Sequence, residues 1–182
     1  YWRRWHISLG AWMKDCIFYP VSVSAPMRRL GKAARQKWPK FGKRLPVYIA
    51  TIITWLATGI WHGLTPNFIL WGMLNCLVIV VSEELTPLYQ RFHKRFRLDQ
   101  RPWYDGFRML RTFLLMNLIR ACDLFPNPKD YFLGIASLFS DIHRVEFLSL
   151  GLDPLDYGIL LCGAVLMAAV SILQEKGVSL RE

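Results

Sequence analysis

The chain has 182 residues, 53% of them hydrophobic, and a formal net charge of +10 at pH 7. Its mean hydropathy of +0.23 and its eight tryptophans are typical of a membrane protein rather than of a water-soluble domain. The basic residues flank apolar segments, which favours a lipid bilayer as their partner and argues against nucleic acid.

The first predicted element, residues 1–20, is an amphipathic helix at the membrane surface rather than a crossing. Steps of three and four residues place its Trp, Leu and Cys side chains on one stripe (Trp2, Trp5, Leu9, Trp12 and Cys16). Pro20 is expected to end the helix. His6 lies on an adjacent stripe, and its spacing alone favours a polar residue on the wet face of the helix.

Two segments rich in Lys and Arg, residues 21–44 and 83–106, are predicted to be cytoplasmic loops. The first contains eight basic residues between Arg28 and Arg44, together with proline and glycine. Positive charge beside apolar spans marks the cytoplasmic side of a membrane protein. We therefore expect both loops on that side, with the turn between them facing the outside.

The segment between these loops, residues 46–82, is a predicted transmembrane helical hairpin. The 38 residues from Leu45 to Ser82 contain no Lys, Arg, Asp or Glu. One helical crossing needs about 20 apolar residues, so this segment is long enough for two. The sequence Gly-Leu-Thr-Pro at 63–66 provides the break between spans at 46–64 and 66–82.

Polar residues within the hairpin follow helical spacing. Each span has one polar face. On the first span this face contains Thr51, Thr54, Thr58 and His62, and on the second it contains Asn67, Trp71 and Asn75. The threonine hydroxyls are expected to bond to carbonyl groups one turn back. His62 is harder to explain by packing, because ionisable side chains inside a membrane are costly and usually serve function.

Residues 107–173 are predicted to form C-terminal helices. Residues 107–121 are apolar but carry three arginines, so we expect other protein to shield this helix from lipid. The following segment, to Asp156, is acidic, which fits an external location. A short surface helix is predicted at Tyr131–Phe139 and a final span at Tyr157–Leu173.

The His and Cys pattern leaves few chemistries open. Zinc needs three or four ligands at suitable spacing, and neither the four histidines nor the four separated cysteines provide them, so no metal site is predicted. A Ser-His-Asp triad lacks a carboxylate within the hairpin. A single imidazole that acts as general base on a hydroxyl group needs neither, and His62 is the candidate.

Three sequence blocks resemble the membrane-bound O-acyltransferase family. The first is YWRRWHISL at residues 1–9, and the second combines TGIWHG at 58–63 with NFILWG at 67–72. A weaker match runs from TFLL at 112–115 to Arg120-Ala121. The pattern is most similar to the bacterial branch that contains the alginate O-acetylase and the D-alanyl transfer protein of teichoic acid modification.

This resemblance implies a site and a reaction. His62 corresponds to the catalytic histidine, and His6 to a second histidine of the catalytic site that lines the same polar tunnel. The implied reaction carries an acyl group, most simply acetyl, from a cytoplasmic thioester to an extracytoplasmic polysaccharide or teichoic-acid-type acceptor. Acetyl-coenzyme A or an acyl carrier protein would be the donor, with no bound cofactor and with accessory acyltransferase proteins as further partners.

Substrate-binding roles are predicted for a second group of residues near the two histidines. Asn67 and Asn75 would position donor or acceptor beside the ring of Trp61. Arg3 and Arg4, with the basic segment 28–44, would attract an acidic donor.

Taken together, the sequence predicts an all-α, polytopic transmembrane protein with amphipathic interfacial helices, located in the cell membrane. Residues 1–182 are expected to form a single membrane domain, the C-terminal portion of a longer acyltransferase core. Two alternatives stay open. One is a non-catalytic conduit or docking subunit that hands an acyl group to a separate external transferase, and the other is a truncated, inactive piece.

Overall fold

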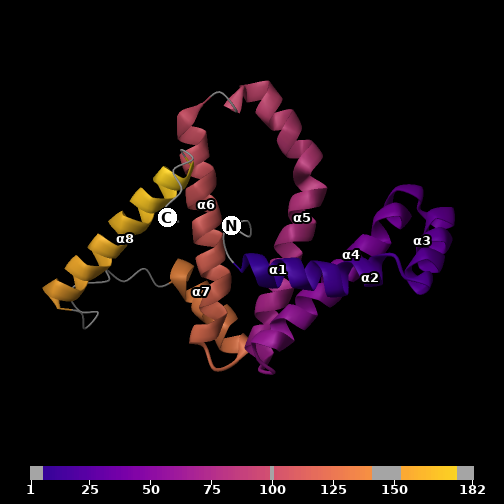
Figure 1. The fold of residues 1–182 in the computed structure, drawn as a ribbon, viewed down its shortest axis with the longest axis horizontal. Helices are drawn as coiled ribbons and strands as arrows, with labels where there is room; N and C mark the ends of the chain where they lie inside the picture. Colours follow the sequence, from indigo (N-terminus) through magenta and orange to yellow (C-terminus); the bar gives the residue numbers. More distant parts are fainter. Residues whose placement is uncertain (1–5, 99–100, 141–152, 176–182) are drawn as a thin grey trace. The chain divides into compact units, whose positions relative to one another are not determined.

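The computed structural model describes residues 6–98, 101–140 and 153–175, and the regular structure of this part of the chain is entirely helical. The all-α prediction is therefore confirmed. The chain divides into two compact units, Tyr1–Ala136 and Ser137–Glu182, and the single membrane domain stays a prediction. The elements follow in the order α1 (Ile7–Met13), η1 (Lys14–Phe18), α2 (Tyr19–Ser22), α3 (Ala25–Lys37), α4 (Pro39–His62), α5 (Pro66–Phe96), α6 (Pro102–Arg120), η3 (Ala121–Leu124), α7 (Pro128–Ser140) and α8 (Pro154–Glu175) (Figure 1).

The first helix does not end at Pro20, as predicted, but continues to Ser22. Its middle, Lys14–Phe18, is a π-helical turn. A proline lacks the backbone N–H and its ring collides with the carbonyl four residues earlier, and the wider π turn gives that ring room. Of this helix, Trp12 and Cys16 are exposed whereas Met13 is buried, and contact of the Trp stripe with the membrane surface stays a prediction. Trp2 and Trp5 lie outside the described residues.

The two predicted basic loops are largely helical. Residues 21–44 contain α3 and the start of α4, and residues 83–106 contain the end of α5 and the start of α6. Ser24 caps α3 by accepting a hydrogen bond from the Met27 amide at 3.4 Å, and Pro26 occupies the first turn, where its missing N–H costs nothing. Pro26, which suggested a loop, therefore lies in the first turn of a helix, and Gly31 and Gly42 allow α3 and α4 to pack closely.

The predicted hairpin is present as α4 and α5, which are joined by residues 63–65. Both helices are long and apolar enough to cross a membrane. The span predicted at 66–82 lies within α5, whereas the one predicted at 46–64 runs two residues past the end of α4 at His62. Two glycines bring the helices close together: a Cβ atom on Gly59 would lie 2.7 Å from the Phe68 carbonyl oxygen, and one on Gly72 would lie 2.5 Å from the Trp55 oxygen. Small residues at such a crossing are typical of membrane helices.

A small core joins the hairpin to the segment that follows it. Trp71 of α5 packs with Ile119 of α6, Cys122 of η3 and Tyr131 of α7. The Tyr131 hydroxyl donates to the Leu118 carbonyl oxygen at 3.2 Å. This core fixes η3 beside the start of α5, and so beside the turn that carries His62. The short helix predicted at Tyr131–Phe139 is confirmed within α7.

Helix α8 belongs to the second unit. It contains the predicted final span, and most of its large apolar side chains are exposed. Its first turn is closed by the Asp156 carboxylate, which accepts from the Asp153 amide at 3.0 Å. That α8 crosses a membrane stays a prediction, as does the shielding of α6 by other protein.

Candidate functional site

A cavity of about 380 Å³ lies between the first helical segment and the α4–α5 hairpin. Figure 1 shows α1 running across the hairpin, and η1 contacts α4 directly. The wall is mostly apolar, with a line of polar groups along α4. The lining residues are His6, Leu9, Gly10, Met13, Lys14 and Phe18; Val47, Tyr48, Thr51, Thr54, Trp55, Thr58 and His62 of α4; and Trp71, Ile79, Val80 and Glu83 of α5.

His62, the last residue of α4, places its imidazole at one end of this cavity. Its Nε2 atom is buried and has no hydrogen-bond partner among the described residues. Three aromatic rings surround it, with centroids 4.9 Å away for Trp61, 4.8 Å for Trp71 and 6.0 Å for Phe68. An unpaired buried polar group costs about 1–3 kcal/mol, so a partner that is not part of the fold is the natural explanation.

His6, the residue before α1, lies beside His62. The centroids of the two rings are 5.6 Å apart, in an edge-on arrangement. The His6 backbone is left-handed, with φ of 51°, which is uncommon for a residue other than glycine. The structure thus brings the two predicted catalytic histidines into one cavity, although the spacing of His6 alone favoured the wet face of its helix.

The three threonines of α4 line the cavity together with His62, as the helical spacing predicted. Each hydroxyl donates to a carbonyl oxygen one turn back: Thr51 to Val47 at 2.8 Å, Thr54 to Ala50 at 2.7 Å and Thr58 to Thr54 at 2.8 Å. This confirms the expected bonding. Because the hydroxyl hydrogens are engaged, the oxygens act toward the cavity as hydrogen-bond acceptors.

Among the described residues, the predicted substrate-binding side chains Asn67, Asn75 and Trp61 do not line the cavity. Asn75 is buried and donates to the Trp71 carbonyl at 2.8 Å. Asn67 donates to the Phe125 carbonyl, and its buried Oδ1 has no partner among the described residues. Trp61 is exposed and touches the cavity only through its contact with the His62 ring. Arg3 and Arg4 lie outside the described residues, so all of these binding roles stay predictions.

Sequence reasoning missed the far end of the cavity. Tyr48 precedes His62 by fourteen positions on one helix, which corresponds to about 21 Å at 1.5 Å per residue. Tyr48 and Trp55 continue the threonine stripe in steps of three and four, so the helical period could have found them. Glu83 likewise continues the Trp71 and Asn75 series of α5 in steps of four, through Ile79. Lys14 carries no such signal, because the packing of η1 against the hairpin brings it to the cavity.

Charged groups are concentrated at this far end. The Lys14 ammonium lies 5.3 Å from the centroid of the Tyr19 ring, and its hydrogen bond with Tyr19 raises the pKa of Lys14, which therefore remains charged. Glu84, next to Glu83, accepts hydrogen bonds from Arg44 and Tyr48 and so ties α5 to α4. The cavity therefore runs from a charged end to an aromatic end where His62 lies.

The cysteines have no direct part in this site. Cys76 and Cys122 are buried, Cys16 and Cys162 are exposed, and all four are free thiols. Burial raises the pKa of the Cys122 thiol, and burial together with Cys122 raises the pKa of Tyr131 to about 12. Both groups are therefore neutral near pH 7. Within the described ranges, no group of three or more His, Cys, Asp or Glu is placed to hold a metal ion.

Comparison with known proteins supports the resemblance drawn from the motifs. Residues 39–123 match the family model described as "MBOAT, membrane-bound O-acyltransferase family". The matched range contains the hairpin, α6 and most of η3. It therefore includes His62 and three of the four core residues, Trp71, Ile119 and Cys122.

Several curated bacterial proteins are similar to this chain. The teichoic acid D-alanyltransferase of Bacillus subtilis is 26% identical over 115 residues, which are 62% of this chain and 26% of that protein. The peptidoglycan O-acetyltransferase of Helicobacter pylori is 29% identical over 51% of this chain and 15% of its own length. For the probable alginate O-acetylase of Azotobacter vinelandii the values are 32%, 47% and 14%.

The chain spans about a quarter or less of the length of these relatives. No solved structure matches it.

Proposed function

We propose that the full-length protein transfers an acyl group from a thioester to a hydroxyl group of a cell-envelope polymer, because residues 39–123 match the membrane-bound O-acyltransferase family model. The names of the relatives support this class of acceptor, since they include teichoic acid, peptidoglycan and alginate. The acyl group we propose is acetyl. A D-alanyl group is the second candidate, because three relatives are named teichoic acid D-alanyltransferases.

One observation carries the proposal: the buried, unpartnered Nε2 atom of His62 at the end of the cavity. This nitrogen accepts the proton of the acceptor hydroxyl while the oxygen attacks the thioester carbonyl carbon. The new C–O ester bond forms and the C–S bond breaks. The thiolate that leaves takes the proton back from the imidazolium, so the products are an ester and a free thiol. General-base assistance of this kind is worth about 10²–10⁴ in rate.

His6 is proposed to position the substrate at His62, because its ring lies 5.6 Å from the reacting imidazole. Asn67 retains a proposed binding role through its unpartnered Oδ1. Asn75 donates one N–H of its amide to the Trp71 carbonyl, which leaves its second N–H and its oxygen for such a role. Trp61 supplies an aromatic surface beside the reacting nitrogen.

The donor is proposed to be acetyl-coenzyme A or an acyl carrier protein thioester that approaches from the cytoplasm. Lys14 at the charged end of the cavity offers a positive charge to such an acidic donor. In this multi-pass arrangement α4 and α5 cross the cell membrane with their basic ends in the cytoplasm, and His62 then lies toward the outer side. Accessory acyltransferase proteins complete the proposed partners.

The test compares full-length wild type with His62→Ala in membranes, at matched expression, with radiolabelled acetyl-coenzyme A as donor. The label that reaches the external polysaccharide fraction is counted. His93→Ala is the matched control, because it removes an imidazole that lies outside the cavity, on α5. We expect His62→Ala to lose transfer and His93→Ala to keep it. Equal label in wild type and His62→Ala would instead favour the non-catalytic conduit.

A further inference from the structure

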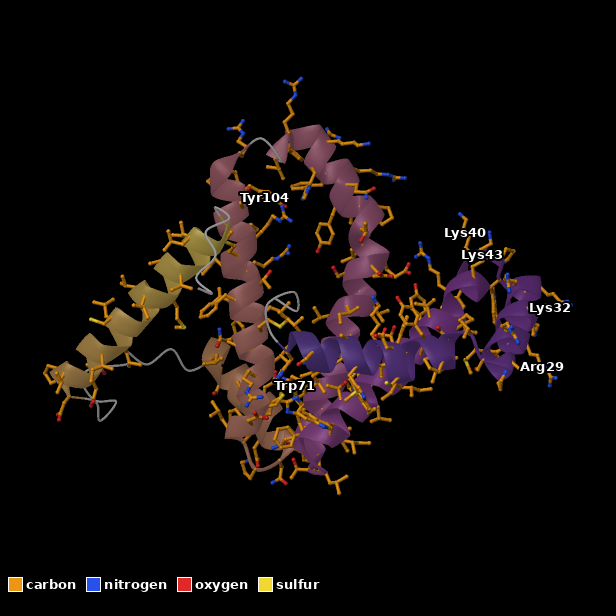
Figure 2. The ribbon with its side chains drawn as sticks, in the orientation of Figure 1. Arg29, Lys32, Lys40, Lys43, Trp71 and Tyr104 are labelled. Atoms are coloured by element: carbon orange, nitrogen blue, oxygen red, sulfur yellow. The ribbon has the colours of Figure 1, made fainter. Side chains whose placement is uncertain are left out.

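Six exposed basic side chains gather on α3 and the first turns of α4, a surface named here the basic corner. Its members are Arg28, Arg29, Lys32, Lys37, Lys40 and Lys43. Figure 2 shows Arg29 and Lys32 projecting outward from α3, and Lys40 and Lys43 from the start of α4. Within the described part of the chain, no acidic side chain pairs with any of the six. Their positive charge is therefore uncompensated by the fold.

The basic corner does not line the cavity. None of its six side chains is among the cavity-lining residues, and the cavity takes its positive charge from Lys14. Neighbouring arginines, in contrast, are engaged within the protein: Arg44 pairs with Glu84, and the Arg35 Nε donates to the Gly31 carbonyl at 3.0 Å. The corner therefore points to a partner outside the site described above.

Exposed apolar side chains lie among these charges. Trp38 is 61% exposed, Phe41 49% and Leu30 39%. Lys and Arg interleaved with Trp, Phe and Leu form the surface that proteins place at the depth of lipid headgroups. A partner in aqueous solution would explain the charges but not the exposed indole and phenyl rings beside them.

The length of α4 places the corner at that depth. Its 24 residues correspond to about 36 Å, whereas the hydrocarbon core of a bilayer is about 30 Å thick. Charge-free sequence begins at Leu45, so the first turns of α4, with Lys40 and Lys43, extend into the headgroup layer. Trp38 alone separates α3 from α4, which keeps the charges of α3 close to the same layer.

Close packing holds α3 in this position. A Cβ atom on Gly31 would lie 2.8 Å from Cγ of Pro46, and one on Gly42 would collide with the backbone of Ala34 and Arg35. The two glycines let α3 lie directly against the start of α4. The positive charges of the two helices are therefore presented together on a rigid surface.

We propose that the basic corner binds the headgroups of anionic phospholipids, with a phosphodiester such as that of phosphatidylglycerol as the ligand. Charges within about 8 Å of an anionic surface act on it with little screening at physiological salt, and each adds about fivefold to the association. The inference concerns a surface separate from the cavity and does not depend on acyl transfer.

The experiment uses full-length protein in phosphatidylcholine bilayers with a trace of a photoactivatable phosphatidylglycerol or phosphatidylcholine probe. Label in peptides from residues 25–44 is counted after illumination. In wild type, we expect the phosphatidylglycerol probe to give at least about five times as much label as the phosphatidylcholine probe. The variant Arg29→Gln/Lys32→Gln/Lys40→Gln/Lys43→Gln should lose this preference. The variant Arg29→Lys/Lys32→Arg/Lys40→Arg/Lys43→Arg keeps the charge and should retain it.

Equal labelling of wild type by the two probes would overturn the proposal, and so would an undiminished preference in the neutral variant. A second readout separates lipid from an acidic protein partner. If the neutral variant keeps the lipid preference but stops taking acyl groups from a carrier protein, the corner binds that protein and the proposal is wrong.

Discussion

The imidazole rings of His6 and His62 lie edge-on to each other with their centroids 5.6 Å apart, although His6 precedes α1 and His62 ends α4. The contact depends on the first helical segment crossing the hairpin. It places both rings in one cavity, and only that of His62 ends in a buried nitrogen with no partner among the described residues. This asymmetry suggests distinct roles for the two histidines.

His6→Asn should slow acyl transfer about 10- to 100-fold, less than the loss of His62, because misplacing a bound substrate is less damaging than losing the proton acceptor. Initial rates over a range of acetyl-coenzyme A concentrations provide the measurement. We expect the apparent KM to rise as kcat falls. A change in the melting temperature comparable to that of a core substitution would indicate a structural role instead.

Thr58→Val should raise the apparent KM for the donor several-fold with little loss of stability, because it removes an acceptor oxygen from the cavity wall but keeps the shape of the side chain. Thr112→Val is the control, since Thr112 makes the same kind of hydrogen bond, to the Arg108 carbonyl at 2.8 Å, outside the cavity. An equal effect of both substitutions on KM would refute a role for the threonine stripe in binding.

Gly72→Ala should destabilise the protein by about 1–3 kcal/mol and reduce transfer, because the new methyl group would lie 2.5 Å from the Trp55 oxygen and force α4 and α5 apart. Thermal unfolding in detergent measures this effect. Gly106→Ala is the matched control: nothing lies within 4 Å of a Cβ atom there, and alanine favours the helix. Unchanged melting of Gly72→Ala would contradict the close approach of the hairpin helices.

Tyr131 should titrate about two pH units above ordinary tyrosines, because burial raises its pKa to about 12. The pKa of Tyr131 in the folded protein exceeds its value near 10 in the unfolded chain. The neutral phenol therefore makes its full contribution to the free energy of unfolding below pH 10, and this contribution is lost as the pH rises toward 12. Tyrosinate absorbance gives the titration. The unfolding midpoint should fall less between pH 9 and pH 11 in Tyr131→Phe than in wild type, and an identical fall would contradict burial.

The hairpin and its polar face were predictable because they depend on local pattern. Charge-free length gives the two helices, and a period of three to four residues places Thr51, Thr54, Thr58 and His62 together. The loop predicted at residues 21–44 rests on proline and glycine as helix breakers, and the one at 83–106 on its basic charge, and neither signal excludes a helix. In the fold, Pro26 and Pro102 start helices, and Gly31 and Gly42 let helices pack closely.

The cavity itself could be predicted only in part. Its α4 wall follows from spacing along one helix, whereas Lys14 meets it through packing between distant segments. The proximity of His6 to His62 followed from the family resemblance, since nothing in the local pattern of residues 1–20 points to the hairpin. The side-chain amides of Asn67 and Asn75 donate to backbone carbonyl oxygens, and the sequence alone does not predict these partners.

The central claim is that the Nε2 atom of His62 accepts the proton of the acceptor hydroxyl. The most direct test is the transfer rate of full-length His62→Gln, whose amide fills similar space but cannot take up a proton. We predict a loss of about 100-fold or more, with an unchanged melting temperature. A transfer rate within a few-fold of wild type would contradict the claim and leave His62 a structural residue of the cavity wall.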